Sequence, residues 1–246
     1  MTYEHWLRDF ETEAERRRQR EDPPWARGAR LDPAIARSIQ RFQVGEAGDG
    51  ANLIAKAGGD DGYLAAVKLF VAEEQNHARM LEELLRAAGV PTIAHHWSDT
   101  VFVRLRRALG LRLELMVLLI AEVVALRYYR ALRDGTRDPL VTRVASLILA
   151  DEERHVPFHC RRLRIGFATL GRTARALVFG AWRLLLLGVT VTVAVDHGRA
   201  LRRLGVGRLV FVADVLTAFE AALARIRGEA PKPRYVPKRA RPRGLF

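Results

Sequence analysis

The 246-residue chain lacks the features that mark disulfide-rich or β-rich proteins. Its single cysteine, Cys160, excludes an internal disulfide framework and fits a reducing compartment. The first 20 residues are charged throughout and contain no apolar core of a signal peptide, so we expect a cytoplasmic protein. β-Branched residues cluster only at 189–193, and no Asp-Gly pair separates alternating runs. We therefore predict an all-α fold.

Lysine is also scarce, occurring only at positions 56, 68, 232 and 238, so the net charge of +13 comes almost entirely from arginine. Such a charge is typical of proteins that bind nucleic acids or anionic membranes. However, the basic residues are spread along the chain, and the densest run, 231–246, has four prolines and no acidic residue. We predict a basic, disordered tail over 229–246 and expect no specific nucleic-acid partner.

Long apolar runs are absent, with one exception. Residues 176–195 are apolar apart from Arg183, and the stretch is long enough to span a bilayer. A central arginine costs about 2.5–3.5 kcal/mol on insertion. We therefore favour a helix that packs on the rest of the protein and uses Gly180 and Gly188 for close approach. Weak membrane association stays open as the alternative.

Two copies of one short pattern stand out against this background: Glu73-Glu74-Gln75-Asn76-His77 and Asp151-Glu152-Glu153-Arg154-His155. Each copy places a glutamate and a histidine three residues apart, so both side chains project from one face of a helix. A further glutamate, Glu46 or Glu122, precedes each copy inside an apolar stripe. Four carboxylates and two imidazoles from four helices form the ligand set of a two-metal site in a helix bundle.

Caps and glycine breaks give the bounds of the helices. We predict an N-terminal amphipathic extension over 1–30 and a helical domain over 31–228. The four-helix core of that domain covers about 33–165, and about two additional helices follow it. The expected helices are 33–57, 63–88, 111–133 and 139–165 in the core, then 173–195 and 208–227.

Apolar residues in steps of three and four carry each of the four glutamates onto a buried seam near the middle of its helix. A buried carboxylate without a partner costs several kcal/mol. The seams contain almost no arginine at the same level, so Glu–Arg pairing does not explain the glutamates. Carboxylates mixed with imidazoles suit iron or manganese better than zinc. We predict a two-metal site whose ligands are Glu46, Glu74, His77, Glu122, Glu152 and His155.

Four neighbouring residues are candidates for supporting roles. Asp151 and Glu73 each precede a paired glutamate and can accept the free N–H of a ligand imidazole. We favour this role for Asp151, whereas for Glu73 a solvated surface charge is an equal alternative. For His159 the alternatives are a seventh metal ligand, a proton donor and a hydrogen-bonded core histidine. We favour the core histidine. For Tyr129 the alternatives are lining a pocket, relaying electrons, and packing in the core with a hydrogen-bonded hydroxyl. We favour core packing.

Together, Glu46, Glu74-Gln75-Asn76-His77, Glu122 and Glu152-Glu153-Arg154-His155 resemble the ferritin-like di-iron superfamily over about 35–162. The resemblance implies a ferritin-like four-helix bundle in which Glu74 and Glu152 bridge two iron ions. In layout the chain is similar to the oxygen-activating branch, in particular to the aldehyde-deformylating oxygenases. Arylamine oxygenases of this superfamily carry an additional histidine one turn before the second paired glutamate, where this chain has Ile148.

The resemblance implies a di-iron oxidoreductase that activates dioxygen and oxidises a small, largely apolar substrate. Manganese or a mixed manganese–iron pair stays open for the metal. An external electron donor such as a ferredoxin or a reductase is implied, because the cysteine-rich electron-transfer domain of rubrerythrins is missing. A homodimer stays open. The alternatives are a ferroxidase that handles iron, which the basic composition disfavours, and a hydroxylase of transfer-RNA nucleosides.

Overall fold

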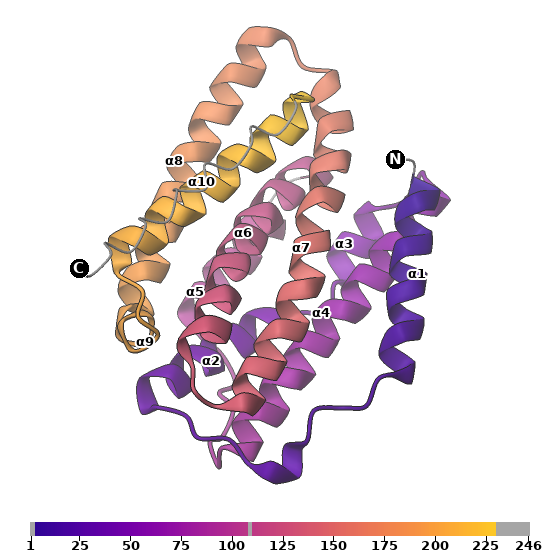
Figure 1. Cartoon of the computed structure of the whole chain (residues 1–246). Helices are drawn as coiled ribbons and strands as arrows, with labels where there is room; N and C mark the ends of the chain where they lie inside the picture. The colour runs from indigo at the N-terminus through magenta and orange to yellow at the C-terminus, as the bar shows by residue number, and fades with distance from the viewer. Residues whose placement is uncertain (1–2, 108–109, 230–246) are drawn as a thin grey trace, which may run out of the picture.

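A bundle of four long helices forms the centre of the molecule (Figure 1). The computed structural model describes residues 3–107 and 110–229, and these residues contain helices and loops but no strand. The central helices are α2 (Pro33–Glu46), α4 (Asp61–Ala87), α6 (Leu111–Gly135) and α7 (Pro139–Ala168). Helix α6 packs along α7, α2 packs along α4, and α4 joins the two pairs through α7. The all-α, ferritin-like fold is therefore confirmed.

Aspartate caps begin three of these helices. The side chain of Asp32 accepts from the backbone N–H of Ala34, and that of Asp60 accepts from the N–H of Tyr63. Asp138 accepts from the N–H of Leu140 and also satisfies the next N–H along the chain. Proline follows Asp32 and Asp138 at the first helical position, as expected for a residue that has no N–H to satisfy.

The first core helix is shorter than the predicted 33–57. Helix α2 ends at Glu46, and a separate short helix, α3 (Ala51–Lys56), follows after the turn at 47–50. Gly50 lies in the left-handed region at φ 63°, and a Cβ on this residue would lie 2.5 Å from the side chain of Val71. Only glycine fits there. Glu46 therefore lies at the end of its helix, not near the middle as predicted.

The remaining helices cover the bundle from outside. Helix α1 (Tyr3–Gln19) packs on α4, and the short 3₁₀ turn η1 (Trp25–Arg27) follows it. Helix α5 (Trp97–Arg107) packs on α6, and α9 (Gly198–Arg203) packs on α2. Helix α10 (Arg208–Arg227) packs on α7, α6 and α8 (Arg172–Asp196). The predicted basic tail, 229–246, lies outside the described residues except for Glu229.

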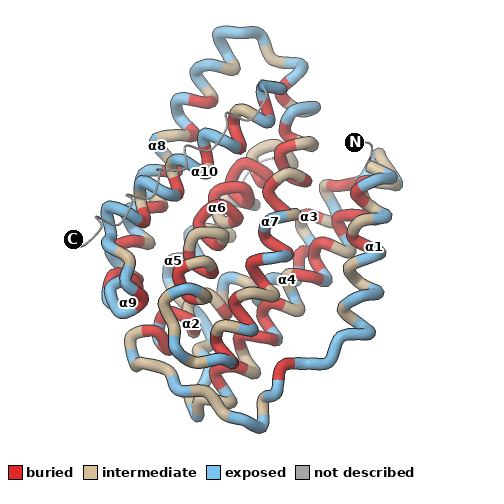
Figure 2. The backbone as a smooth tube through the Cα atoms, viewed as in Figure 1, coloured by how far each residue is buried: buried red, intermediate tan, exposed pale blue. Residues whose placement is uncertain are grey.

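Helix α8 packs on the bundle as predicted, but along one face only. It is the one helix among the described residues that is long and apolar enough to cross a membrane. Much of it is pale blue in Figure 2, where buried residues are red. The predicted close approach at Gly180 and Gly188 is wrong, because a Cβ on either residue would meet no atom within 4 Å. Both glycines lie on the exposed side of the helix.

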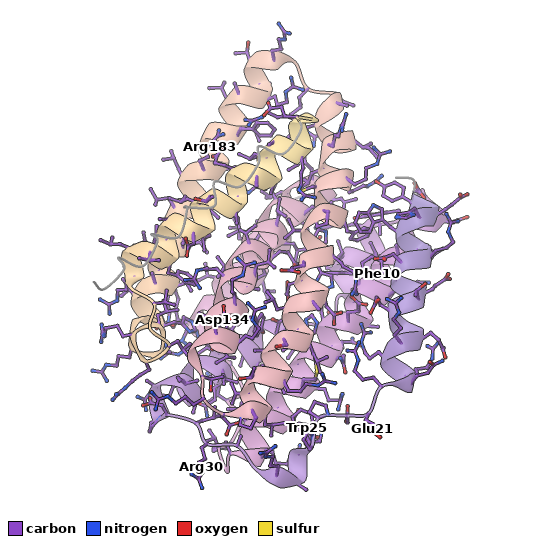
Figure 3. All side chains as sticks on the ribbon, viewed as in Figure 1. Phe10, Glu21, Trp25, Arg30, Asp134 and Arg183 are labelled. Carbon is purple, nitrogen blue, oxygen red and sulfur yellow. The ribbon has the colours of Figure 1, made fainter. Side chains whose placement is uncertain are left out.

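Phe10 anchors α1 to the bundle and provides a test of this packing (Figure 3). Its side chain is fully buried and meets the ring of Phe158 edge-on at 5.1 Å. We expect Phe10→Ala to lower the free energy of unfolding by about 3–5 kcal/mol, measured by urea denaturation. Leu209→Ala, at a residue that is 85% exposed, should change it by less than about 0.5 kcal/mol. Equal stability of the two variants would show that α1 is not docked in solution.

Candidate metal centre

The six residues with metal-ligand spacing meet in the middle of the bundle. They are Glu46 on α2, Glu74 and His77 on α4, Glu122 on α6, and Glu152 and His155 on α7. The candidate ligand atoms form two groups, and the atoms within each group all lie within 4.8 Å of one another. Glu74 and Glu152 belong to both groups. The first group adds Glu46 and His77, and the second adds Glu122 and His155. The arrangement therefore offers two adjacent positions, each with one glutamate and one histidine of its own.

Five of the candidate ligand atoms at this centre are buried and have no hydrogen-bond partner among the described residues. They are Oε1 of Glu74, Nδ1 of His77, Oε2 of Glu122, Oε2 of Glu152 and Nδ1 of His155. Nδ1 of His155 lies between 3.1 and 3.7 Å from the carboxylate oxygens around it. Buried polar atoms are nearly always paired, so five unpaired atoms at one point need an explanation. Two divalent cations would satisfy them, and this donor set fits iron or manganese.

Each histidine is oriented by the acidic residue of the opposite motif. Nε2 of His77 lies 3.1 Å from Oδ2 of Asp151, and Nε2 of His155 lies 2.9 Å from Oε2 of Glu73. A proton held on Nε2 by a carboxylate leaves the lone pair of Nδ1 free for a cation. The structure thus places both candidates where they can orient an imidazole. The alternative for Glu73, a solvated charge, is wrong, because its side chain is 1% exposed.

Two arginines neutralise these acidic residues. A guanidinium nitrogen of Arg154 lies 2.7 Å from Glu73, and another lies 3.0 Å from Asp151. Arg17 of α1 lies 2.6 Å from Glu73 and 3.5 Å from Asp151. Burial raises the pKa of Asp151, but its contacts with His77 and the two arginines outweigh burial and hold that pKa below its usual value. No sequence pattern singles out Arg17, because it lies outside the core helices.

Crowding of the inner carboxylates shifts their pKa values. Burial and the charge of Glu122 raise the pKa of Glu152 to about 8. Burial, followed by the charges of Glu74 and Glu152, raises the pKa of Glu46 well above its usual value. Burial lowers the pKa of His155, but its carboxylate neighbours outweigh burial and raise it. Like charges this close cannot all ionise unless protons or cations neutralise them, so the centre is suited to exchange protons for cations.

Tyr129 extends the centre on one side. Its ring is buried and its hydroxyl donates to Oε1 of Glu46 at 2.7 Å, so the expected satisfied hydroxyl is present and fixes a candidate ligand. Burial, then the charge of Glu46, raises the pKa of Tyr129, which keeps the phenol protonated.

His159 extends it on the other side. Its ring is buried and meets Phe70 edge-on, and its Nε2 lies 3.4 Å from Oε1 of Glu122. His159 is a core histidine as predicted, but neither ring nitrogen has a hydrogen-bond partner among the described residues. Because its Nε2 faces the carboxylate of Glu122, His159 remains a candidate for a role at the centre.

A cavity of about 550 Å³ opens onto the four glutamates. Its walls are mostly apolar and come from α2, α5, α6 and α8, with residues such as Phe42, Phe102, Leu118 and Leu185. His197 also lines the cavity, with Nδ1 2.7 Å from Oγ of Ser38. Burial lowers the pKa of His197 to about 4, so its imidazole is neutral at pH 7. The sequence did not single out His197, because it lacks ligand spacing.

The reciprocal contacts give a test of the centre. We expect Asp151→Asn to weaken metal binding by about tenfold to a hundredfold, because the imidazole of His77 loses its charged acceptor. Titration of the protein with ferrous iron against a chelator, without oxygen, measures this effect. The control is Glu153→Gln, since Glu153 lies on the same turn but its side chain is 59% exposed. Equal affinities would show that His77 needs no orienting partner.

Comparison with known proteins adds one match. The model of the family P-aminobenzoate N-oxygenase AurF matches residues 64–214, more than half of the chain. No curated protein and no solved structure matches the chain. The matched residues include α6, α7 and both Glu-x-x-His motifs.

The predicted ferritin-like di-iron superfamily is therefore confirmed. Within it the match is to an N-oxygenase family, although the layout suggested the aldehyde-deformylating group and Ile148 replaces the additional histidine of arylamine oxygenases. The chain belongs to the AurF family of di-iron, ferritin-like oxygenases.

Proposed function

We propose that this protein is a di-iron oxygenase that uses dioxygen to oxidise a small, neutral and largely apolar substrate. The observation that carries the proposal is the cavity, whose apolar walls lead to Glu46, Glu74, Glu122 and Glu152. A binding pocket of this size and composition is typical of small-molecule sites. Glu46, Glu74, His77, Glu122, Glu152 and His155 would hold the two metal ions, and His159 is the candidate for a seventh ligand.

Iron bound there would supply the one-electron chemistry and dioxygen reactivity that amino-acid side chains lack. The protein's own residues fix the ligands: Tyr129 holds Glu46, Asp151 holds His77, and Glu73 holds His155. The apolar walls exclude water from the reacting centre, which limits side reactions. Because the chain has one cysteine, it has no thiolate cluster of its own, and an external donor such as a ferredoxin or a reductase would supply electrons.

The polar groups of the cavity favour a neutral substrate. Apart from the four glutamates, the side chains with polar groups in the walls are Arg41, Thr192, His197 and Trp97. Arg41 already binds the carboxylate of Asp196 at 2.9 Å, and its guanidinium also donates to the backbone carbonyl of that residue. His197 is neutral at pH 7. A substrate carboxylate would therefore find no free cation among these side chains, which favours an apolar amine or hydrocarbon over p-aminobenzoate.

Ferrous loading followed by oxygen tests the metal chemistry. We expect two ferrous ions per chain without oxygen, and a new near-ultraviolet absorption band when oxygen is added. Glu74→Ala should lose both, because Glu74 contributes to both metal positions. Glu82→Ala, about two turns along α4 at a residue whose side chain is 46% exposed, is the control. Continued uptake of iron beyond two ions per chain, without any substrate, would point to iron handling instead.

Blocking the cavity tests the substrate site separately. Ala121 lines the cavity on α6, one residue before Glu122. We expect Ala121→Trp to fill part of the cavity and to lower kcat/KM for an apolar amine by at least tenfold, with metal content unchanged. Ala121→Ser, which adds little volume, should behave like the wild type. Full turnover by the tryptophan variant would place the substrate elsewhere.

A further inference from the structure

An uninterrupted apolar stripe runs along the outer face of α8. Its members are spaced four and three residues apart and are all exposed: Leu177, Ala181, Leu184, Gly188, Val191 and Val195. The side chains of Leu177 and Leu184 are 70% and 71% exposed. Such steps keep residues on one face of a helix. Single exposed apolar residues are ordinary, but a stripe of this length marks an interaction surface.

The stripe is continuous with the mouth of the cavity. Leu184 and Gly188 both belong to the stripe and line the cavity. On α5, Trp97 and Val101 line the same cavity, and they are 56% and 57% exposed. The exposed faces of α8 and α5 therefore meet at the cavity, and we call their combined surface the α5–α8 face.

Basic residues accompany the α5–α8 face. Arg104 is exposed and lies one turn beyond Val101 on the same side of α5. The segment 172–208 contains seven arginines and one acidic residue, Asp196, which is paired with Arg41. Arg199 and Arg202, which follow the stripe on α9, are exposed. An apolar face with a tryptophan and with arginines near its ends is typical of helices that lie in the interface of an anionic membrane.

We propose that the α5–α8 face docks on an anionic membrane surface and that small, largely apolar substrates pass from the bilayer into the cavity. The substrate part rests on the proposed function, whereas the docking does not. Helix α8 lies on the membrane and does not span it, because Phe179, Trp182 and Leu186 on its other face are buried against the protein. The ion pair of Arg183 with Glu220 of α10 ties it to the bundle as well.

A second copy of the chain is the competing occupant of this face. It would cover the mouth through which substrate must pass, and a symmetric contact would bring the arginines of two copies together. A membrane covers the same apolar area, attracts the arginines and supplies the substrate. The charge and the position of the mouth therefore favour the membrane.

Vesicle co-sedimentation of the full chain tests the proposal. We expect binding to vesicles of phosphatidylcholine with phosphatidylglycerol, weaker binding to phosphatidylcholine alone, and weakening by salt. Leu184→Glu should lower the affinity at least tenfold, and Arg104→Gln about fivefold. Leu184→Met, which stays apolar at the same position, is the control. Equal binding of the glutamate and methionine variants, or no binding by the wild type, overturns the proposal.

Two further measurements separate the alternatives. Sedimentation velocity without lipid reports the oligomeric state, and a wild-type dimer that Leu184→Glu splits, without vesicle binding, would assign the face to a second copy. Ferrous loading of Leu184→Glu should remain at two ions per chain, and Ala121→Trp should bind vesicles like the wild type. If the wild type binds no ferrous iron, the proposed function is overturned. The vesicle co-sedimentation result still decides the docking, because it does not depend on metal.

Discussion

The reciprocal pairing of α4 with α7 aligns the two halves of the candidate metal centre. The acidic residue that begins each Glu-x-x-His motif holds the histidine that ends the other motif, so His77 pairs with Asp151 and His155 pairs with Glu73. The two contacts are reciprocal. A slip of one helix by a turn, about 5.4 Å, would break both and would pull the shared glutamates apart. One helix pair therefore sets both the candidate metal ligands on these two helices and their orientation.

The pairing also divides the charges of the centre into two layers. The inner layer holds four carboxylates and two imidazoles, and each of them except Glu46 has an unpaired atom that needs a cation or a proton. In the outer layer Glu73 and Asp151 are neutralised by Arg17 and Arg154. Because the outer layer is neutralised within the protein, the unmatched charge lies among the six candidate ligands of the inner layer. Helix α1 supplies Arg17, so the N-terminal segment contributes to the electrostatics of the centre.

The sequence predicts the inner layer well because periodicity and ligand chemistry coincide there. Apolar steps of three and four place Glu122 and Glu152 on buried seams, and both are buried in the structure. Prediction is weaker where tertiary contacts decide. The break between α2 and α3 depends on the fit of Gly50 against Val71, which no helix periodicity reveals. The roles of Arg17 and His197 depend on distant segments that meet only in the fold.

The cavity links the chemistry of the centre to the outer surface of the molecule. Leu184 lines the cavity and is also 71% exposed, so at this point the wall is one side chain thick. Access to the glutamates and the composition of the α5–α8 face therefore cannot vary independently. A polar substitution that made α8 more soluble would also make the mouth of the cavity more polar and admit water. Leu184 and Gly188 thus serve two surfaces, because they belong both to the exposed stripe and to the apolar route to a charged centre.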